Sequence, residues 1–478
     1  MISYTSIAEI QQALRSGTVT CRALVEQYLQ RAADTVDLNA YVEIWADEAL
    51  QQADATDRLL REAPDQTGRL FGVVLSIKDN ICYKGHQATA GSRILSGFTS
   101  LYSATAVERL VAEGAIIIGR TNCDQFGMGS SNENSAYGPV RHPLDPARVP
   151  GGSSGGAAVA VATGTCIAAL GSDTGGSVRQ PAGFCGLWGL KPSYGRVSRH
   201  GLIAYGSSFD QIGFLTHNAA DSALLLSVCS GADEFDGTAT TRPTPAATLP
   251  APDRPLRLAY FPQTFESESI DAGVRTVQTA LKNALRSAGH QVEPVDFPLL
   301  DYTVPAYYVL TTAEASSNLS RFDGMRYGYR SPMATDVETT YQKSRSEGFS
   351  DEVKRRIMLG SFVLSSGYYD AYYTRAQQVR RLLRDRVREV LDQYDAILLP
   401  VAPSVAWKFG EKSDDPTAMY LSDIFTVLAN LCGMPAVSIP LDRHPDNGMP
   451  IGIQLLGRMY EESQLLSIGN QLPADRAE

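Results

Sequence analysis

The sequence has no long apolar run and no excess of positive charge. No stretch approaches the ~20 apolar residues that a membrane-spanning helix needs, and its start, MISYTSIAEIQQALRSG, has the pattern of an amphipathic helix instead of a cleavable leader. The net charge of −10 argues against a surface built mainly for nucleic-acid phosphates, although a partner or a local patch could still handle such a ligand. We expect a cytoplasmic protein.

Cysteine and histidine are too scattered for a metal centre. The six histidines and seven cysteines form no CxxC pair and no Cys/His cluster with zinc spacing. The sequence therefore predicts reduced, buried thiols, and it gives no reason to expect a metal or an organic cofactor in this chain. The cysteines are Cys21, Cys82, Cys123, Cys166, Cys185, Cys229 and Cys432.

Short apolar runs alternate with helical patterns along most of the 478 residues. Continuous apolar strands separated by helices indicate a sheet covered on both faces, which is an α/β fold. Helical spacing is clear over 107–111 and 270–285. The segment 233–255 is rich in Pro, Thr and Asp, which favours a long surface loop over a domain linker. The expected strands are 71–77, 115–119, 256–261, 396–400, 436–440 and 451–456.

The stretch 148–183, RVPGGSSGGAAVAVATGTCIAALGSDTGGSVRQPAG, is rich in glycine and hydroxyl side chains and almost free of charge. A phosphate cradle is one interpretation, but the stretch contains neither GxxxxGK[ST] nor GxGxxG. A structural role, with close packing at glycines and helix caps at hydroxyls, explains some of these residues. The third interpretation is nucleophilic catalysis, which requires a base near a serine and amides that hold an oxyanion.

Ser177 is the candidate nucleophile, because Gly175 and Gly176 just before it let backbone amides turn inward. No histidine base lies between His142 and His200. Lys78 follows the apolar run 71–77. A lysine there is usually a surface residue at a strand end, but burial lowers the pKa of a lysine and makes it a neutral base. The GGSSGG run supplies hydroxyls for a relay between the two residues.

The runs PGGSSGGAAVAVATG and LGSDTGGSVRQPAGFCGLWGLKPSYGRVS closely resemble the signature of the amidase signature family. The resemblance implies an α/β fold with a large mixed central β-sheet, helices on both faces, and a single domain over 1–478 with the catalytic signature at about 71–215. It also implies a Ser–cis-Ser–Lys triad, which falls on Lys78, Ser153 and Ser177, with a cis peptide bond before Ser153.

Other stretches resemble the A subunits of the glutamyl-tRNA(Gln)/aspartyl-tRNA(Asn) amidotransferases. They are GRVSRHGLIAYGSSFDQIG, AEASSNLSRFDGMRYGYR, SRSEGF, EVKRRI and SSGYYDAYY. This implies glutamine hydrolysis that supplies ammonia within a heterotrimer formed with amidotransferase subunits B and C. ATP and Mg²⁺ would serve amidation of a mischarged tRNA in the B subunit, which would also be the main site of tRNA binding. Cys123 and Gln125 depart from the subfamily, which commonly has methionine and an acidic residue there, near the expected substrate pocket or tunnel mouth.

In the implied mechanism, neutral Lys78 accepts a proton from Ser153, which accepts one from Ser177 as this serine attacks the amide. The predicted oxyanion hole is formed by backbone amides of Thr174, Gly175, Gly176 and Ser177. The resemblance also implies a glutamine pocket in which Asp423 binds the α-ammonium and Arg356 the α-carboxylate, with Tyr307 assisting. Taken alone, Arg356 fits a solvated helix face and Tyr307 fits core packing.

Two alternatives remain for the function. A stand-alone amidase for small carboxamides would use the same triad, and a non-catalytic scaffold would not need it. The arginines of a probable helix at 375–388 could contact tRNA, but Asp385 and Glu389 interrupt them, which favours a solvated, ion-paired face. These arginines are Arg375, Arg380, Arg381, Arg384, Arg386 and Arg388.

Overall fold

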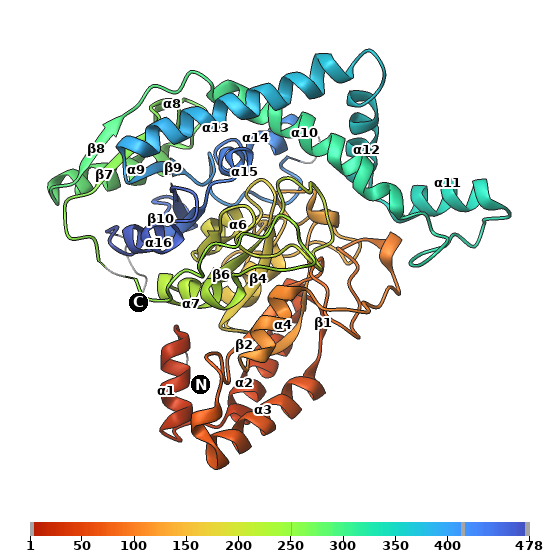
Figure 1. Ribbon diagram of the computed structural model, residues 1–478, viewed down its shortest axis with the longest axis vertical. Coiled ribbons are helices and arrows are strands. Elements are labelled where there is room, and N and C mark those ends of the chain that lie inside the picture. The colour runs from red at the N-terminus through yellow and green to blue at the C-terminus, as the bar shows by residue number, and fades with distance from the viewer. Residues whose placement is uncertain (1–3, 250, 413–415, 474–478) are drawn as a thin grey trace.

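A mixed β-sheet runs through the computed structural model, which describes residues 4–249, 251–412 and 416–473 (Figure 1). The eleven strands found in these residues form one sheet in the order β1-β3-β2-β4-β6-β5-β10-β11-β9-β7-β8. Parallel pairs join β2 to β3 and β4, and β7 to β8 and β9, whereas the other neighbours are antiparallel. The strands are β1 (Tyr41–Ile44), β2 (Val74–Lys78), β3 (Ile116–Thr121), β4 (Ala168–Asp173), β5 (Trp188–Lys191), β6 (Gln211–Thr216), β7 (Arg257–Tyr260), β8 (Gln291–Pro294), β9 (Ala396–Pro400), β10 (Ala436–Arg443) and β11 (Pro450–Leu456).

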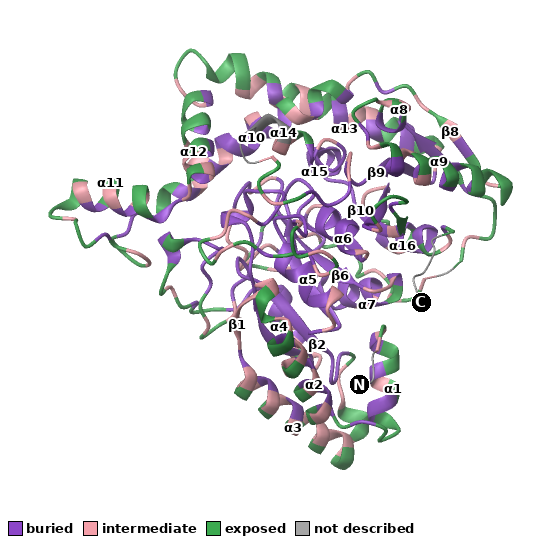
Figure 2. Ribbon diagram, turned by 180° about the vertical axis from the view of Figure 1, so that it is seen from behind, coloured by how far each residue is buried: buried purple, intermediate pink, exposed green. Residues whose placement is uncertain are grey.

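Helices cover the sheet and extend beyond its ends (Figures 1 and 2). The helices α1–α3 lie at one end of the molecule, and α10–α13 lie at the other, where α11 projects outward. The helices are α1 (Ile7–Arg15), α2 (Cys21–Asp34), α3 (Ala46–Glu62), α4 (Thr105–Ala112), α5 (Gly155–Ala162), α6 (Arg179–Cys185), α7 (Ala219–Cys229), α8 (Gln263–Glu266), α9 (Ala272–Ser287), α10 (Thr303–Asn318), α11 (Val337–Gly348), α12 (Asp351–Val363), α13 (Arg375–Gln393), α14 (Pro416–Leu421), α15 (Val427–Cys432) and α16 (Glu462–Asn470).

The α/β prediction with a mixed central sheet is confirmed, and each of the six apolar runs overlaps with a strand of this sheet. The first of them starts later than expected, at Val74, because Gly72 has a left-handed backbone (φ +69°) that interrupts an extended chain. The helix expected at 270–285 is α9, which begins after Asp271, whose carboxylate accepts hydrogen bonds from the amides of Gly273 and Val274.

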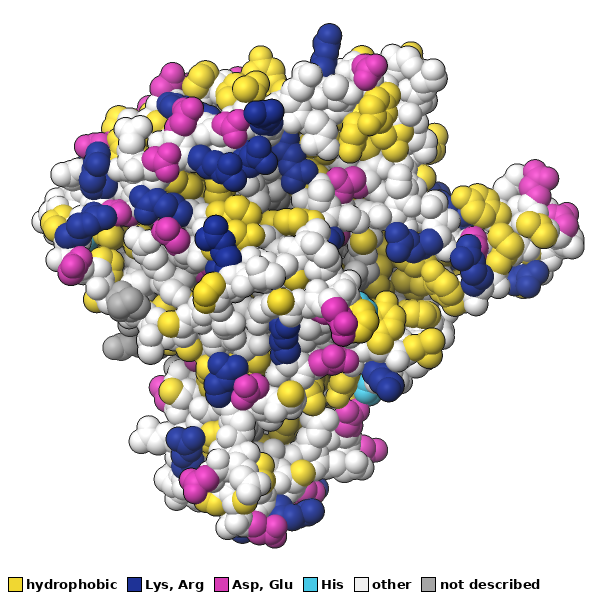
Figure 3. All heavy atoms as spheres, viewed as in Figure 1, with side chains coloured by type: hydrophobic (Ala, Val, Ile, Leu, Met, Phe, Trp, Pro, Cys, Tyr) yellow, Lys and Arg dark blue, Asp and Glu magenta, His cyan; other side chains and the backbone are white. Residues whose placement is uncertain are grey.

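The described residues of 233–255 form no helix or strand and connect α7 to β7. The single-domain organisation stays a prediction of the sequence. Acidic and basic side chains are mixed over the face shown in Figure 3. Among the described residues, no helix is both long and apolar enough to cross a membrane.

The glycine- and serine-rich stretch lies in the middle of the molecule, where burial is greatest (Figure 2). Helix α5 is apolar on all sides and packs against β2, β3 and β4. A Cβ atom on Gly156 would lie 2.4 Å from the carbonyl oxygen of Asn122 and 2.5 Å from that of Ala40, so only glycine permits this approach. The close packing places the turn before α5 next to the ends of β2 and β4.

Candidate active site

Lys78 is the last residue of β2, and its side chain is completely buried. Its Nζ atom lies 2.7 Å from Ser153 Oγ, 3.0 Å from Ser154 Oγ and 2.9 Å from Ser172 Oγ. Burial lowers the pKa of Lys78, although nearby groups, including Asp124 and Asp173, oppose this shift. The structure thus brings Lys78 and Ser153 together, in surroundings that lower the pKa of the lysine amine.

Ser153 follows a cis peptide bond, as the family resemblance implies. Gly152 on the other side of this bond donates its amide to Gln180 Oε1 at 2.9 Å. A Cβ atom on Gly152 would lie 2.2 Å from Asp124 Oδ2, so this position has no room for a side chain. The same Asp124 carboxylate accepts hydrogen bonds from two amides of the loop that packs over the turn, those of Asn132 and Asn134.

Ser177 lies in the turn between β4 and α6, beside the turn that carries Ser153. The amide of Ser154 donates to the carbonyl oxygen of Ser177 at 3.1 Å, which joins the two turns. Ser177 keeps 8% of its surface exposed, while Ser153 and Lys78 have none. Within the described residues, no hydrogen bond links the two serine hydroxyls. Catalytic hydrogen bonds often tighten only when substrate is in place, so the roles of the three residues stay predictions.

The turn before Ser177 offers some, but not all, of the predicted oxyanion donors. Gly176 donates its amide to Asp173 Oδ1 at 2.9 Å, so a carboxylate already occupies this donor. In the part of the chain that the structure describes, the amides of Gly175 and Ser177 make no hydrogen bond. Thr174 is held by its hydroxyl, which donates to Asp210 Oδ1 at 2.6 Å. Gly176, with φ +132°, shapes the turn and is not a free donor in this structure.

A buried ion pair fixes the nucleophile turn to the opposite part of the sheet. Arg179 Nη2 lies 3.0 Å from Asp173 Oδ1, and neither side chain is exposed. Burial alone would raise the pKa of Asp173, but Arg179 lowers it to about 2. Arg179 also donates to Gln454 Oε1 and Asn430 Oδ1. Sequence reasoning missed this positioning role, although Asp173 is the one acidic residue in a long uncharged stretch.

Arg356 faces inward from α12 and is 4% exposed. Its Nη1 atom donates to the hydroxyl of Tyr205 at 2.8 Å, and its Nε atom donates to Glu352 Oε1 at 2.7 Å. The guanidinium also lies 5.4 Å from the ring centres of both Tyr308 and Tyr420. These surroundings show that Arg356 does not lie on a solvated helix face.

Asp423 and Tyr307 both lie near the nucleophile turn, because Thr426 Oγ1 is 2.6 Å from the carbonyl oxygen of Gly175 and 3.1 Å from that of Asp423. Asp423 accepts a hydrogen bond from Ser130 Oγ at 2.6 Å. Burial raises the pKa of Asp423 to about 7, against the opposing effects of Ser130 and Arg356. A Cβ atom on Gly175 would lie 2.4 Å from the Tyr307 hydroxyl, which places this hydroxyl against the turn. Asp423 therefore lies in the segment between α14 and α15, and Arg356 on α12 acts on its carboxyl group.

Sequence reasoning missed several partners of this pocket. Tyr205 lies inside GLIAYGSSFDQIG, a stretch that carried the resemblance without being assigned a role, whereas Ser130 and Glu352 gave no separate signal. Gln125 accepts hydrogen bonds at 3.1 Å from the hydroxyl of Ser92 and from the amide of Ser350, the residue that caps α12. Gln125, which stands where the resembled subfamily commonly has an acidic residue, thus helps to position the helix that carries Arg356.

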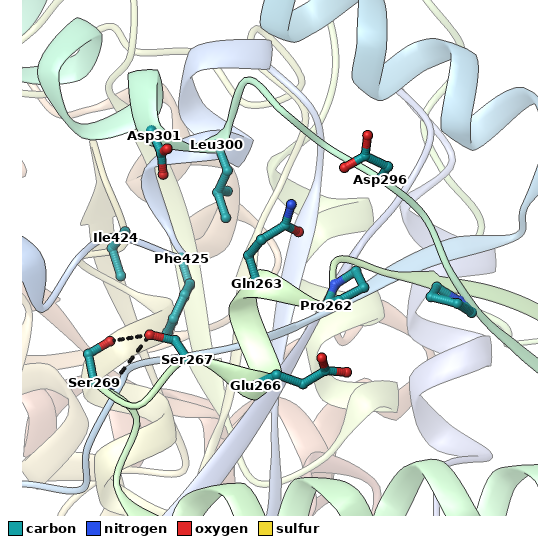
Figure 4. Close-up of a pocket in the computed structure, with 11 residues that line it drawn as sticks. Pro262, Gln263, Glu266, Ser267, Ser269, Asp296, Leu300, Asp301, Ile424 and Phe425 are labelled. Atoms are coloured by element: carbon teal, nitrogen blue, oxygen red, sulfur yellow. Dashed lines mark hydrogen bonds between the residues drawn. The ribbon is translucent and has the colours of Figure 1, made fainter.

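A separate pocket of about 730 Å³ is lined by Ile424, Phe425 and residues around α8 (Figure 4). The close-up shows the hydroxyls of Ser267 and Ser269, which are 2.8 Å apart, at its edge. None of the triad residues lines this pocket. In the described residues, no group of three or more His, Cys, Asp or Glu side chains is arranged to hold a metal ion.

The sequence profile of the amidase family matches residues 23–466 of this chain. The chain belongs to the amidase family. Among its relatives is the A subunit of the glutamyl-tRNA(Gln) amidotransferase of Chlorobium luteolum, with 51% identity over 475 residues, 98% of this chain and 97% of the relative. The protein of the same name from Chlorobium phaeobacteroides strain BS1 is 48% identical, over 99% of this chain and all of the relative.

Solved structures of amidase-family proteins share the fold. The crystal structure of the glutamyl-tRNA(Gln) amidotransferase A subunit from Thermotoga maritima matches with a TM-score of 0.77 and 39% identity, over 94% of this chain and 90% of the other. The peptide amidase of Stenotrophomonas maltophilia matches with a TM-score of 0.79 and 28% identity, over 98% and 96% of the two chains. The predicted recognition of the amidase family is confirmed.

Proposed function

We propose that this amidase-family chain is the glutamine-hydrolysing subunit of a tRNA-dependent amidotransferase. The relatives that are about half identical over nearly the whole chain carry the name of the glutamyl-tRNA(Gln) amidotransferase A subunit. The observation that carries the proposal is a pair of opposite charges, Arg356 and Asp423, which are both buried and act on each other, with Thr426 joining Asp423 to the turn before Ser177. A free amino acid presents the matching pair of charges, whereas a simple carboxamide does not.

Glutamine binds with its α-carboxylate toward Arg356 and its α-ammonium toward Asp423. A guanidinium suits a carboxylate because two parallel N–H donors can meet its two oxygens. Tyr307, whose hydroxyl lies against Gly175, closes the pocket between these charges and the turn. The side-chain amide of glutamine then reaches Ser177.

Catalysis follows from the Lys78–Ser153 contact. Ser177 Oγ attacks the amide carbon while its proton passes to Ser153 Oγ, whose own proton passes to the neutral Nζ of Lys78, 2.7 Å away. The amides of Gly175 and Ser177 face the developing oxyanion, and each such donor is worth ~3–4 kcal/mol of barrier. Return of a proton through the relay expels ammonia, and water then hydrolyses the glutamyl ester on Ser177.

The released ammonia serves a partner. The chain works within a heterotrimer with amidotransferase subunits B and C. The B subunit uses ATP and Mg²⁺ to convert glutamate on tRNA(Gln), or aspartate on tRNA(Asn), to its amide, and it makes most of the contacts to the mischarged tRNA. Our proposal requires no metal or organic cofactor in this chain, and it places the complex in the cytoplasm.

The test is ammonia release from glutamine and from simple carboxamides, measured on the chain purified with whatever subunits accompany it. We expect glutamine to be preferred by at least about tenfold in kcat/KM, and glutaminamide or propionamide to be poor substrates because they lack one or both charges. Equal or better hydrolysis of uncharged carboxamides would instead favour a stand-alone amidase.

A further inference from the structure

An arginine pocket of about 370 Å³ lies beside α13, away from the residues assigned to glutamine hydrolysis. One face of α13 contributes Arg380, Arg381, Arg384 and Arg388, which recur at helical spacing and therefore line the same side. The opposite wall comes from the end of α15 and from Tyr194 and Met459. None of the residues that line this pocket is acidic.

The positive charges of Arg381, Arg384 and Arg388 in the arginine pocket are poorly compensated. Arg380 is held in place, because it donates to oxygens of Leu431 and Ser208 and lies near the carboxylate of Glu314, which accepts from the same Ser208 hydroxyl. Arg381 and Arg384 share the carboxylate of Asp385, at 3.7 and 3.6 Å, which is too far for a hydrogen bond. The Nε atom of Arg384 is buried and has no hydrogen-bond partner. Among the described residues, Arg388 forms no ion pair.

The guanidinium groups converge on one place. Burial raises the pKa of the Cys432 thiol to about 12, and Arg380, Arg384 and Arg388 all oppose this rise. The three guanidinium groups and this thiol line the same cavity. Four arginines with two nearby carboxylates, Asp385 and Glu314, leave a local excess of positive charge on a chain whose net charge is −10. Figure 3 shows basic side chains gathered on the face over α13.

The uncompensated charge indicates an anionic ligand with more than one negative charge. A single carboxylate would neutralise one of the four guanidinium groups, whereas successive phosphates can each accept a paired set of N–H bonds. From Arg380 to Arg388 the row extends about 12 Å along the helix axis, at 1.5 Å per residue. The Arg381 side chain is 77% exposed, so a long ligand in solvent can reach the arginines along this face of α13.

We propose that the arginine pocket binds the phosphate backbone of the tRNA directly, so that this chain adds a contact to those made by the partner. The proposal rests on the proposed function, which brings an aminoacyl-tRNA to the complex. It replaces the expectation of a solvated, ion-paired face at these positions. Arg386 does fit the expectation of an ion-paired face, because it lies outside the pocket and pairs with Glu389 at 3.1 Å.

The test compares tRNA binding by the full chain, alone and with its co-purified subunits, in wild type and in Arg384→Ala/Arg388→Ala. Fluorescence anisotropy with a labelled tRNA(Gln) transcript is measured from 50 to 300 mM KCl. We expect the double substitution to raise Kd at least about tenfold for the chain alone. The slope of log K against log salt should shrink by about two, one for each phosphate that is no longer neutralised. Arg386→Ala, on the same helix, is the matched control and should change Kd less than about twofold.

Three outcomes would overturn the proposal. One is unchanged tRNA affinity and salt slope in the double variant. Another is loss of co-purifying subunits without loss of tRNA affinity, which would assign the pocket to an acidic protein surface. The third is arginine-dependent binding of inorganic phosphate or ATP at millimolar concentration that does not compete with tRNA, which would assign it to a free phosphate compound.

Two further measurements separate this proposal from the proposed function. Glutamine hydrolysis should be unchanged in the double variant, because the arginine pocket contains none of the residues assigned to the reaction. A wild-type chain that binds tRNA through these arginines but does not hydrolyse glutamine would overturn the proposed function alone. Arg384→Lys/Arg388→Lys preserves charge and helix propensity, so partial recovery of tRNA affinity by this variant would show that charge, and not folding, was lost.

Discussion

The two halves of the candidate active site are built in different ways. The triad half is held by backbone: two turns, a cis peptide bond and glycines whose neighbours leave no room for a side chain. The recognition half is held by side chains on α10, α12 and the segment before α15, where Arg356 contacts Glu352 and Tyr205. Under the proposed function, the reacting atoms would be fixed by the chain path, whereas substrate choice would be set by charged side chains.

The largest effect should come from the triad half. Replacing Lys78 by Met removes the proton acceptor of Ser153 and should lower kcat for glutamine by roughly 10⁴-fold or more. Lys343→Ala, a surface substitution, is the control. The rate of ammonia release from glutamine is measured for both variants. A fall in kcat of less than tenfold for Lys78→Met would show that this lysine does not take part in the reaction.

Arg179 connects the two halves, since it bonds Asp173 below the nucleophile turn and the backbone oxygen of Thr426 next to the recognition segment. Arg179→Met leaves the carboxylate of Asp173 buried and unpaired, which should cost about 3–5 kcal/mol of stability. Because Arg179 holds the pKa of Asp173 near 2, the carboxylate is charged at neutral pH and the ion pair contributes to the free energy of unfolding there. The substitution should therefore lower the free energy of unfolding at neutral pH, and the contribution of the pair should fade only as the pH falls toward 2. Chemical denaturation at pH 7.5 measures it, and an unchanged midpoint would show that the pair is not a structural link.

In the recognition half, Arg356→Ala should raise the KM for glutamine about tenfold or more while kcat falls much less, since a lost charge-assisted hydrogen bond is worth roughly 1.5–3 kcal/mol. Lys354→Ala, on the exposed side of the same helix, should leave both constants unchanged. Steady-state glutaminase kinetics test this. A fall in kcat at constant KM would mean that Arg356 acts on the chemistry and not on recognition.

The smallest effect is a pH dependence of binding. Burial raises the pKa of Asp423 to about 7, so this carboxyl becomes neutral as the pH falls through 7 and loses its attraction for the α-ammonium group. The KM for glutamine should therefore rise several-fold between pH 8 and pH 6. Asp423→Asn should have a high KM that no longer depends on pH in this range, and a retained pH dependence would point to another titrating group.

Much of the triad half could be predicted from the sequence, because its residues lie in one unusual stretch and at the end of one apolar strand. The α/β fold, Lys78 at the end of its strand, and the turn at Gly175–Ser177 followed from local pattern. The amide of Gly176 was assigned to the oxyanion hole, but it binds Asp173. Local pattern does not show which acceptor lies behind a turn.

The recognition half could be named only through resemblance. Its residues Tyr307, Arg356 and Asp423 come from three segments that are 49 and 67 positions apart, and their contacts depend on tertiary packing. Tyr205 contacts Arg356 across 151 positions, and Ser130 contacts Asp423 across 293. No periodicity or spacing in the sequence encodes such pairs. The arginines of α13 are a similar case. Their number could be counted in the sequence, but which of them lack an acidic partner in the folded chain could not be predicted.

The central claim is that Ser177 releases ammonia from glutamine for a partner that can also use free ammonia. The most direct measurement is amidation of Glu-tRNA(Gln) by the purified complex containing Ser177→Ala, with either glutamine or ammonium chloride as nitrogen donor. We predict that glutamine-dependent amidation is abolished and ammonium-dependent amidation is retained, with Ser320→Ala, an exposed serine, active with both. Retained glutamine-dependent amidation by Ser177→Ala would contradict the account.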